Sequence, residues 1–342
     1  MIERGQNRLR VVLPWLEPAL GAAAIEGRAC ARVPAAEWLL ARGRSNPVQD
    51  IPWREWLLAP VAARTDLLRR CPAGPAGRAN STGRPPEGTW ACARPVHLAT
   101  AIEHLRLAPE DVEVQAGESS ALLEDINRHL EGRGLRLHAQ AGWVDWQLEC
   151  DEPIECGSVE PELAAGRSIR DLMPGGRDGA RVRALMNEIQ MLLHEHPVNQ
   201  DRAGHGRPAI NTLWLWGFGR FEETDEVSLP MLYTDDAWLS GIWRLNGMQS
   251  EPLDELAKGF DAGGGQVLVA GSRPPGDSLS GNGLIDALAQ AERSCFAPAL
   301  AALRSGIVSG VDLLLGGRAY AVERSARFKF WRRAHPLAGA PA

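Results

Sequence analysis

The feature that most constrains the fold is an amphipathic helix followed closely by an apolar strand. In RVRALMNEIQMLLHEHP (181–197), apolar residues recur at the spacing of one helical face, and Pro197 ends the pattern. That stripe consists of Val182, Leu185, Met186, Ile189, Leu193 and His196. INTLWLWG (210–217) is a short apolar run, which is typical of a buried strand, and it ends at a glycine. A helix with one apolar face must be covered, so the pair favours helices layered on a sheet.

Other segments extend this alternation of strands and helices along the chain. Apolar runs at 9–13 and 266–270 are typical of buried strands, and residues 135–150 alternate like two paired strands. Residues 311–322 contain Gly316-Gly317 and predict a hairpin. We therefore expect an α/β fold with a layered, mostly parallel sheet. The strands near 9–13, 210–216 and 266–270 should lie in its centre, with the hairpin at an edge.

One stretch has the composition of a linker. CPAGPAGRANSTGRPPEG (71–88) is rich in proline, glycine and small polar residues and has no apolar period. We expect it to be exposed and mobile, and to separate an N-terminal region of strand and helices (1–70) from a larger α/β region (89–335).

Charge and cysteine content argue against several classes of protein. The 342 residues carry a net charge of −6, so the whole chain offers no attraction to nucleic acid or to an anionic membrane. No apolar run is long enough to span a bilayer, the N-terminus is a poor signal peptide, and the 6 cysteines show no zinc-type spacing. A cytoplasmic location with reduced cysteines is expected. The basic, aromatic ARFKFWRR (326–333) resembles a nucleic-acid contact, but a strand with a solvated basic side is favoured.

Two possible metal sites are disfavoured by their spacing. His194 and His196 are two residues apart, and such residues on a helix point about 200° away from each other. Asp235-Asp236 could bind a cation, but Thr-Asp-Asp before a helix is more simply a helix cap. No metal site and no cofactor are predicted from these residues.

The same central segment offers a candidate cleft for a small anion. Arginine forks match phosphate and carboxylate, asparagine adds donors and acceptors, and an aromatic strand ending in Gly-x-Gly could floor a pocket. The candidate ligand-binding residues are Asn199, Arg202, Arg207, Asn211, Trp214, Trp216, Gly217 and Gly219. The alternative is that Asn199, Arg202 and Asn211 only satisfy backbone groups of a loop. A dinucleotide-binding turn is disfavoured, because Glu222 stands where a third glycine is needed.

The central block also resembles a known family. NEIQMLLHEHPVNQDRAGHGRPAINTLWLWGFG (187–219) and YTDDAWLSGIWRLNGM resemble the archaeal-type, cofactor-independent phosphoglycerate mutases. RVVLPWL, PVHL, CFAPALAALRSG and FKFWRR are more similar still to bacterial regulatory proteins of the RpfE type, which are phosphoglycerate mutase-like. The resemblance covers about 90–335 and implies an alkaline-phosphatase-like α/β fold.

The resemblance implies that active members of that group use two metal ions and a serine nucleophile. Here the first strand is not followed by Asp-Gly, no serine nucleophile follows, and the segment after 266–271 holds Asp277 but no histidine. The expected function is therefore a non-catalytic regulatory protein, a pseudoenzyme that binds a small phosphorylated or acidic ligand or a protein partner. The alternatives are an active mutase or phosphatase with manganese or zinc, and an interaction module that uses a tryptophan-rich surface.

Overall fold

The computed structural model describes most of the chain, in two compact units. It describes residues 7–25, 31–48, 51–61, 64–100, 105–108, 112–139, 144–223, 227–260, 265–272, 283–329 and 331–337. Unit 1 comprises Met1–Arg64, Val227–Asp236 and Met248–Ala342, and unit 2 comprises Thr65–Glu226 and Ala237–Gly247. Each unit has its own sheet and its own core.

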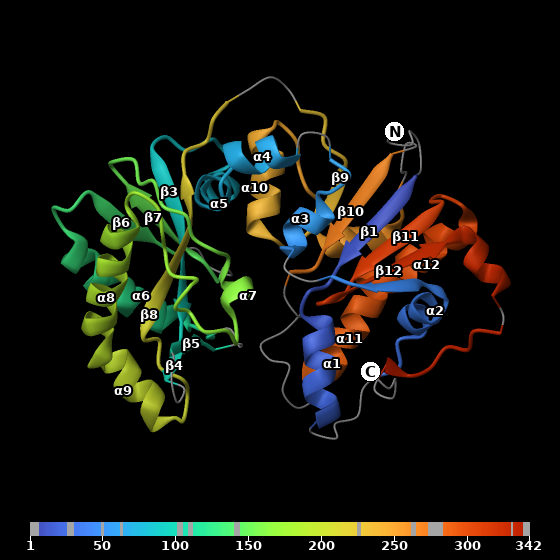
Figure 1. The fold of residues 1–342 in the computed structure, drawn as a ribbon, viewed down its shortest axis with the longest axis horizontal. Helices are drawn as coiled ribbons and strands as arrows, with labels where there is room; N and C mark the ends of the chain where they lie inside the picture. The colour runs from blue at the N-terminus through green and yellow to red at the C-terminus, as the bar shows by residue number, and fades with distance from the viewer. Residues whose placement is uncertain are drawn as a thin grey trace. The chain divides into compact units, whose positions relative to one another are not determined.

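Unit 1 is built on a mixed, mostly parallel sheet (Figure 1). Its strand order is β2 (Arg44–Pro47), β12 (Arg318–Glu323), β11 (Gly310–Leu314), β1 (Arg8–Val12), β10 (Gln266–Ala270) and β9 (Met231–Thr234). β11, β1, β10 and β9 run parallel, β12 pairs antiparallel with β11, and β2 pairs antiparallel with β12. The predicted α/β class, the central position of β1 and β10, and the β11–β12 hairpin are confirmed, although β2 rather than the hairpin forms the outer edge.

Alternation along β1 explains how this sheet is covered. Leu9 and Val11 point to one face and join a large apolar core, while Arg10 points to the other face and donates to the backbone of α3 (Trp53–Leu57). The core side is covered by α1 (Leu16–Ile25), α2 (Pro34–Arg42), α11 (Gly283–Ala291) and α12 (Ala297–Ser305). A π-helical turn, η2 (Glu292–Phe296), joins α11 to α12, and a 3-10 helix, η1 (Leu253–Lys258), packs against it.

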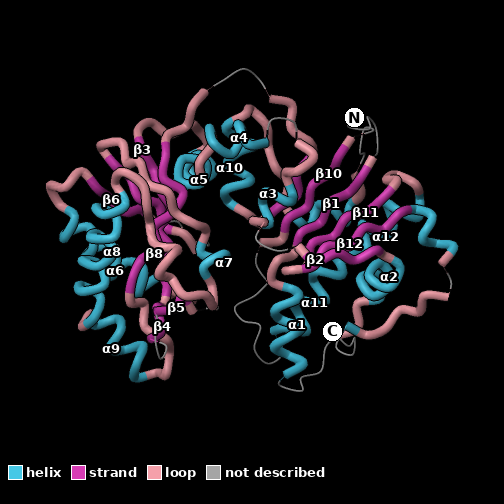
Figure 2. Tube along the Cα trace, viewed as in Figure 1, coloured by secondary structure: helices cyan, strands magenta, loops and turns pink. Residues whose placement is uncertain are grey.

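Unit 2 is built on an antiparallel sheet with helices on both faces (Figure 2). Its strand order is β6 (Leu135–His138), β7 (Trp146–Cys150), β3 (Thr89–Val96) and β8 (Thr212–Gly219). The helices are α4 (Arg64–Arg70), α5 (Ala73–Thr82), α6 (Ala116–Leu130), α7 (Pro161–Ala164), α8 (Gly179–His194), α9 (Pro197–Gly204) and α10 (Ala237–Leu245). A small pair, β4 (Leu98–Thr100) and β5 (Leu105–Leu107), completes the unit. The pairing predicted for 135–150 is confirmed as β6–β7.

The strand predicted at 210–216 is present, but the prediction of its sheet was wrong. It becomes β8, which is an edge strand of the antiparallel sheet in unit 2 rather than a central strand of the parallel sheet. The physical reason is that helices cover both faces of β8, so its first five residues are buried on both sides. An apolar run reports this two-sided burial and not the identity of the neighbouring strands.

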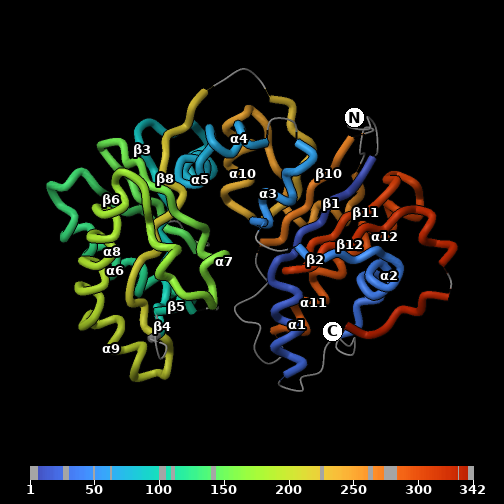
Figure 3. The backbone as a smooth tube through the Cα atoms, in the orientation of Figure 1, coloured from blue at the N-terminus to red at the C-terminus, as the bar shows by residue number. Residues whose placement is uncertain are grey.

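The expected exposed linker at 71–88 is also wrong over most of its length. Residues 73–82 form α5, which contacts β3, β8 and α10 and buries most of its small residues. Small side chains permit this close approach. A Cβ on Gly74 would lie 2.3 Å from the carbonyl oxygen of Trp90, and one on Gly241 of α10 would lie 1.8 Å from that of Ala76. The glycine and alanine content therefore permits tight packing here. Figure 3 shows α5 beside α10, with which it is in contact.

Two further features of the described residues concern sequence expectations. Cys71, Cys92, Cys150, Cys156 and Cys295 form no disulfide, and Cys30 lies outside the described residues. No helix in the described ranges is both long and apolar enough to cross a membrane.

Candidate functional site

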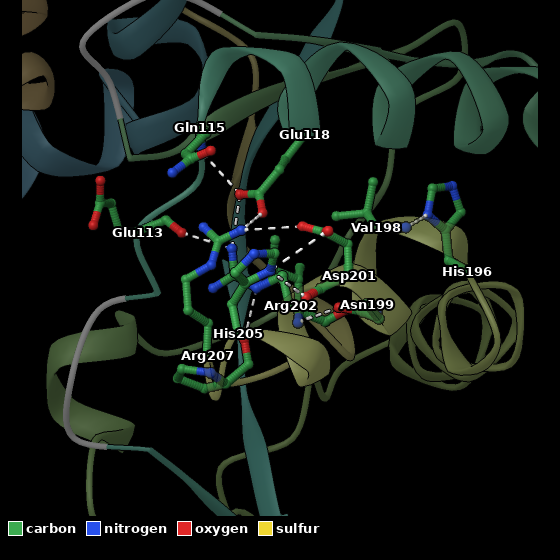
Figure 4. A network of polar contacts seen from close by, with 12 residues as sticks. Glu113, Gln115, Glu118, His196, Val198, Asn199, Asp201, Arg202, His205 and Arg207 are labelled. Carbon is green, nitrogen blue, oxygen red and sulfur yellow. Dashed lines mark hydrogen bonds and ion pairs between the residues drawn. The ribbon is translucent and has the colours of Figure 1, made fainter.

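The candidate anion-binding arginines converge on a carboxylate within unit 2 (Figure 4). Arg202 of α9 donates from Nη1 to Oε2 of Glu118 at 2.7 Å, and Arg207 donates from Nη2 to Oε1 at 2.5 Å. Arg202 also donates to the carbonyl oxygens of Pro208 and Glu113. We call Glu118, Arg202 and Arg207 the Glu118 cluster. Two guanidinium groups therefore share one carboxylate.

Local sequence positions Glu118 in the first turn of α6. Its carboxylate accepts the backbone N–H of Gln115, and the Gln115 side chain accepts a bond in return, which together form a capping box. A carboxylate near a helix N-terminus is also favoured by the helix dipole. Glu118 thus holds the start of α6 and binds α9 at the same time.

Burial differs sharply between the two arginines. The side chain of Arg202 is 2% exposed and that of Arg207 is 28% exposed. Burial lowers the pKa of Arg202, while the charge of Glu118 opposes that shift. A buried arginine needs its carboxylate, because an uncompensated buried charge costs several kcal/mol. Arg207 is the member of the cluster that solvent and a dissolved anion can reach.

Asn199 and Asn211 bind the backbone instead of facing the arginines. Asn199 donates to the carbonyl oxygens of Leu193 and Ile210 and accepts the N–H of Ile210. Asn211 exchanges two hydrogen bonds with Leu98, at 2.8 and 2.9 Å. Both amides thus satisfy backbone groups, as the alternative interpretation of these residues expected, and neither lines a cleft with Arg202.

The predicted aromatic floor is part of the core. Trp214 is fully buried and donates its indole N–H to Val159, while Trp216 is 3% exposed and donates to Asp145. Gly217 and Gly219 allow α5 to approach: a Cβ on either would lie 2.5 Å from Ala73 or Pro72. These four residues pack β8 against its neighbours, and a ligand-binding role for them stays a prediction.

Sequence reasoning missed Glu118 as the partner of both arginines. Its local signal was present, because Gln115 and Glu118 have the spacing of a capping box just before an amphipathic helix. Sequence reasoning also treated 198–209 as a loop, whereas Pro197 opens α9 and places Asn199 and Arg202 on one helix.

His196 and His97 have structural partners, whereas His194 is exposed. His196 is buried, contacts Asp125 through Nε2 at 3.0 Å, and accepts the N–H of Val198 at the start of α9. His194 is the last residue of α8 and is exposed. His97 contacts the carbonyl oxygen of Ala209 at 2.9 Å.

A second polar site lies at the carboxyl end of the parallel strands of unit 1. Asp235 directly follows β9 and accepts the N–H of Ser272, which follows β10, at 2.7 Å. Asp236 forms a buried ion pair with Arg54 of α3 at 2.7 Å. The pKa of Asp235 is raised to about 6 by desolvation and by the charge of Asp236. Part of the residue is nevertheless exposed to solvent. Ligands of open α/β sheets bind at this edge.

The two-metal site implied by the family resemblance does not fit the residues found at this edge. β1 continues into Leu13, Pro14 and Trp15, which supply no oxygen or imidazole ligand from their side chains. Asp236 is already bound to Arg54. Within the described ranges, no three His, Cys, Asp or Glu side chains are grouped as metal ligands would be. Asp277 lies outside the described residues.

Most described tryptophans are buried and cannot form an interaction surface. The following side chains belong to buried residues: Trp15, Trp53, Trp90, Trp146, Trp214, Trp216 and Trp243. Trp331 is the large exception, at 67% exposed. The alternative of a tryptophan-rich interaction surface therefore loses most of its residues to the two cores.

Comparisons with known proteins give partial and distant matches to one group. A 2,3-bisphosphoglycerate-independent phosphoglycerate mutase of Methanosarcina barkeri is 26% identical over 120 residues, which is 34% of this chain and 30% of that protein. A probable enzyme of the same name from Geobacter sulfurreducens is 37% identical over 68 residues, or 19% of this chain and 17% of that protein. One from Methanothermobacter thermautotrophicus is 31% identical over 108 residues, or 31% and 27%. The matched stretches thus span less than a third of those relatives.

Two solved structures align with most of the chain at low TM-scores. The cofactor-independent phosphoglycerate mutase of Thermoplasma acidophilum has a TM-score of 0.37 at 16% identity, covering 93% of this chain and 89% of that one. The PH0037 protein of Pyrococcus horikoshii has a TM-score of 0.41 at 14% identity, covering 94% and 88%. No protein-family model matches the chain. The homologues are therefore phosphoglycerate mutase-like proteins that match at a distance and in part.

Proposed function

We propose that this protein is a non-catalytic, regulatory or ligand-binding member of the phosphoglycerate mutase-like group. The observation that carries the proposal is the side-chain set at the carboxyl end of β1 and β9. Leu13, Pro14 and Trp15 stand after the first strand, and the Asp236 carboxylate is held by Arg54. A two-metal phosphotransfer site needs free carboxylates and imidazoles at such positions.

The partial relatedness to mutases supports the group, and the altered edge supports loss of the chemistry. The mutase activity is named for whole relatives, and the stretches that match this chain make up less than a third of each of them. Fold and function separate readily when site residues are replaced on a retained scaffold. This reasoning favours a binding role over turnover.

The Glu118 cluster supplies the candidate contact for a phosphorylated or acidic ligand. Its two arginines share one buried carboxylate, and Asp201 reaches Arg207 only at 3.7 Å, so a phosphate can compete with Asp201 for the exposed guanidinium. A charge-assisted bond from a guanidinium to phosphate contributes roughly 1.5–3 kcal/mol. Arg207 would make this bond, because Arg202 is enclosed.

Calorimetry with 3-phosphoglycerate tests the binding role. The wild-type protein should release or absorb heat on titration, and Arg207→Ala should weaken the affinity by about tenfold, at ~1.4 kcal/mol per decade. The matched control is Arg136→Ala, an exposed arginine on β6 of the same unit, which should leave affinity unchanged. Absence of heat in the wild-type protein contradicts the proposed ligand class.

Turnover and metal analysis test the non-catalytic part separately. Purified protein should show no mutase or phosphatase activity above background with added manganese or zinc. Stoichiometric bound metal together with turnover would establish the alternative, an active metal-dependent enzyme. Because binding and turnover are measured independently, either half of the proposal can fail alone.

A further inference from the structure

A cluster of cations and exposed aromatic rings lies on unit 1. It joins the C-terminal ends of α2 and α12 to the 3-10 helix η3 (Arg324–Phe328) and the residues after it. We call it the basic aromatic patch. Its members are Trp38, Arg42, Arg304, Arg324, Arg327, Phe328, Lys329, Trp331, Arg332 and Arg333. The strand expected at 326–333 is wrong, because η3 and irregular backbone occupy the described part of this segment.

Contacts between distant segments hold the patch together. The indole ring of Trp38 is flanked by two guanidinium groups, with Arg42 at 4.6 Å and Arg304 at 5.2 Å from the ring centroid. Lys329 donates to the carbonyl oxygen of Arg42 at 3.2 Å, and Arg332 donates to that of Gly43 at 3.0 Å. The segment after η3 is thus fixed against the end of α2, so its side chains are presented in a defined place.

Positive charge in this patch is not neutralised by the described residues. The Nε and Nη1 atoms of Arg42 are buried, and no described residue forms a hydrogen bond with them. Burial lowers the pKa of Arg42, and the nearby charge of Arg304 lowers it further. Among the ion pairs formed by described residues, none joins an acidic group to Arg42, Arg304 or Arg333. Repulsion between like charges is relieved when an anion binds beside them.

The aromatic rings distinguish this patch from simple capping of helix ends. Cations at the C-termini of α2 and α12 complement the helix dipoles, which accounts for Arg304, Lys329 and Arg332. It does not account for Phe328 and Trp331, which are 62% and 67% exposed beside those cations. The guanidinium of Arg327 lies 4.7 Å from the centroid of the Phe328 ring, so cations and rings are combined here as they are at Trp38.

We propose that the basic aromatic patch binds single-stranded nucleic acid. Phe328 and Trp331 offer faces on which bases stack, and the surrounding guanidinium groups offer forks that match phosphate. Arginine greatly outnumbers lysine here, and guanidinium planes also stack on rings, as they do on Trp38. The net charge of −6 made nucleic acid an unexpected partner of the whole chain, but binding depends on the local field and not on the total.

An anionic membrane surface is the rival polyanion. Membrane association scales with the apolar area that enters the lipid, and two separated rings on an irregular segment supply little. No amphipathic helix carries these rings, since η3 is one short 3-10 segment in this described part of the chain. Stacking therefore accounts better for the rings than insertion does.

Fluorescence anisotropy with a labelled oligothymidylate of about 16 nucleotides tests the proposal on the full chain. The wild-type protein should bind at low salt, and the logarithm of the affinity should fall linearly with the logarithm of salt concentration. Phe328→Ala and Trp331→Ala should each weaken binding by about tenfold, which corresponds to ~1.4 kcal/mol. Arg333→Ala should reduce the salt slope by about 0.7.

Matched controls separate stacking and charge from general surface effects. Met191→Ala removes a 78% exposed apolar side chain of unit 2, and Arg84→Ala removes an exposed cation of unit 2; neither should change the affinity. Thermal melts of every variant check that the fold is retained. The proposal is overturned if the oligonucleotide does not bind at low salt, or if both aromatic variants bind like wild type. Binding to phosphatidylserine vesicles that is lost in Trp331→Ala, with no oligonucleotide binding, would assign the patch to membranes.

Discussion

Arg202 and Glu118 are 84 residues apart in the sequence, yet they form a 2.7 Å ion pair from which water is almost excluded. The pair ties α9 to the first turn of α6, while Arg207 occupies the second oxygen of the same carboxylate. One carboxylate therefore serves a buried structural contact and a contact at the surface. Replacing Arg202 and replacing Arg207 should therefore change the unfolding free energy by different amounts.

Arg202→Ala should destabilise the protein strongly. It leaves Glu118 buried with one cation and deprives two backbone carbonyl oxygens of their donor, so a loss of about 3–5 kcal/mol in unfolding free energy is expected. Arg207→Ala removes a partly solvated partner and should cost about 1 kcal/mol. Urea denaturation of both variants measures the difference. Equal losses would show that the cluster does not divide into a structural and an exposed arginine.

Gly241→Ala should be among the most damaging single-methyl additions in unit 2. The new Cβ would lie 1.8 Å from the backbone oxygen of Ala76, so α10 and α5 must separate, at a cost of roughly 1–3 kcal/mol or more. Gly117→Ala is the matched control, because nothing lies within 4 Å of its added Cβ and it is in α6. That change should stabilise by about 0.5–1 kcal/mol. Thermal melting of the two variants should shift in opposite directions.

Trypsin should spare Arg78 in the native protein. This residue lies in α5, and its guanidinium stacks on Trp90 at 4.6 Å from the ring centroid, so cleavage requires local unfolding of a packed helix. Arg84 is uninformative because Pro85 follows it. Arg177, whose side chain is 77% exposed, provides the reference for an accessible site. Mass spectrometry of early fragments decides, and rapid cleavage after Arg78 would restore the linker interpretation.

Acid should weaken unit 1 through Glu37. This buried carboxylate accepts two hydrogen bonds from Arg32, which lower its pKa against the opposing effect of burial. Its stabilising contribution is therefore present above the unfolded pKa of about 4.3 and is lost as the pH falls toward the lower folded value. Urea midpoints of wild type and Glu37→Gln should differ at neutral pH and converge in acid. A constant difference across that range would exclude this linkage.

Local patterns in the sequence predicted local structure well. The β11–β12 hairpin was predictable because Gly316-Gly317 separates two apolar runs, and α8 because its apolar stripe has one period. The paired strands β6 and β7 and the central strands β1 and β10 were also readable from alternation and apolar runs.

Contacts between distant segments could not be read in this way. The sheet that receives β8 depends on pairing with β3, more than a hundred residues earlier, and the same holds for the occupied amide of Asn211. The composition of α5 suggested mobility because glycine lowers helix propensity and small side chains bury little area. In the structure these small residues let the backbones approach closely. A single sequence shows which residues are small, and not what they pack against.

The interleaving of the two units sets an order of events during synthesis. All but a short piece of unit 2 lies within Thr65–Glu226, so its antiparallel sheet is complete when β8 leaves the ribosome. β1, by contrast, pairs with β10 and β11, which follow it by more than 250 residues. Until β10 and β11 are made, the nascent chain therefore carries β1 without these neighbours, a state that invites aggregation or chaperone capture.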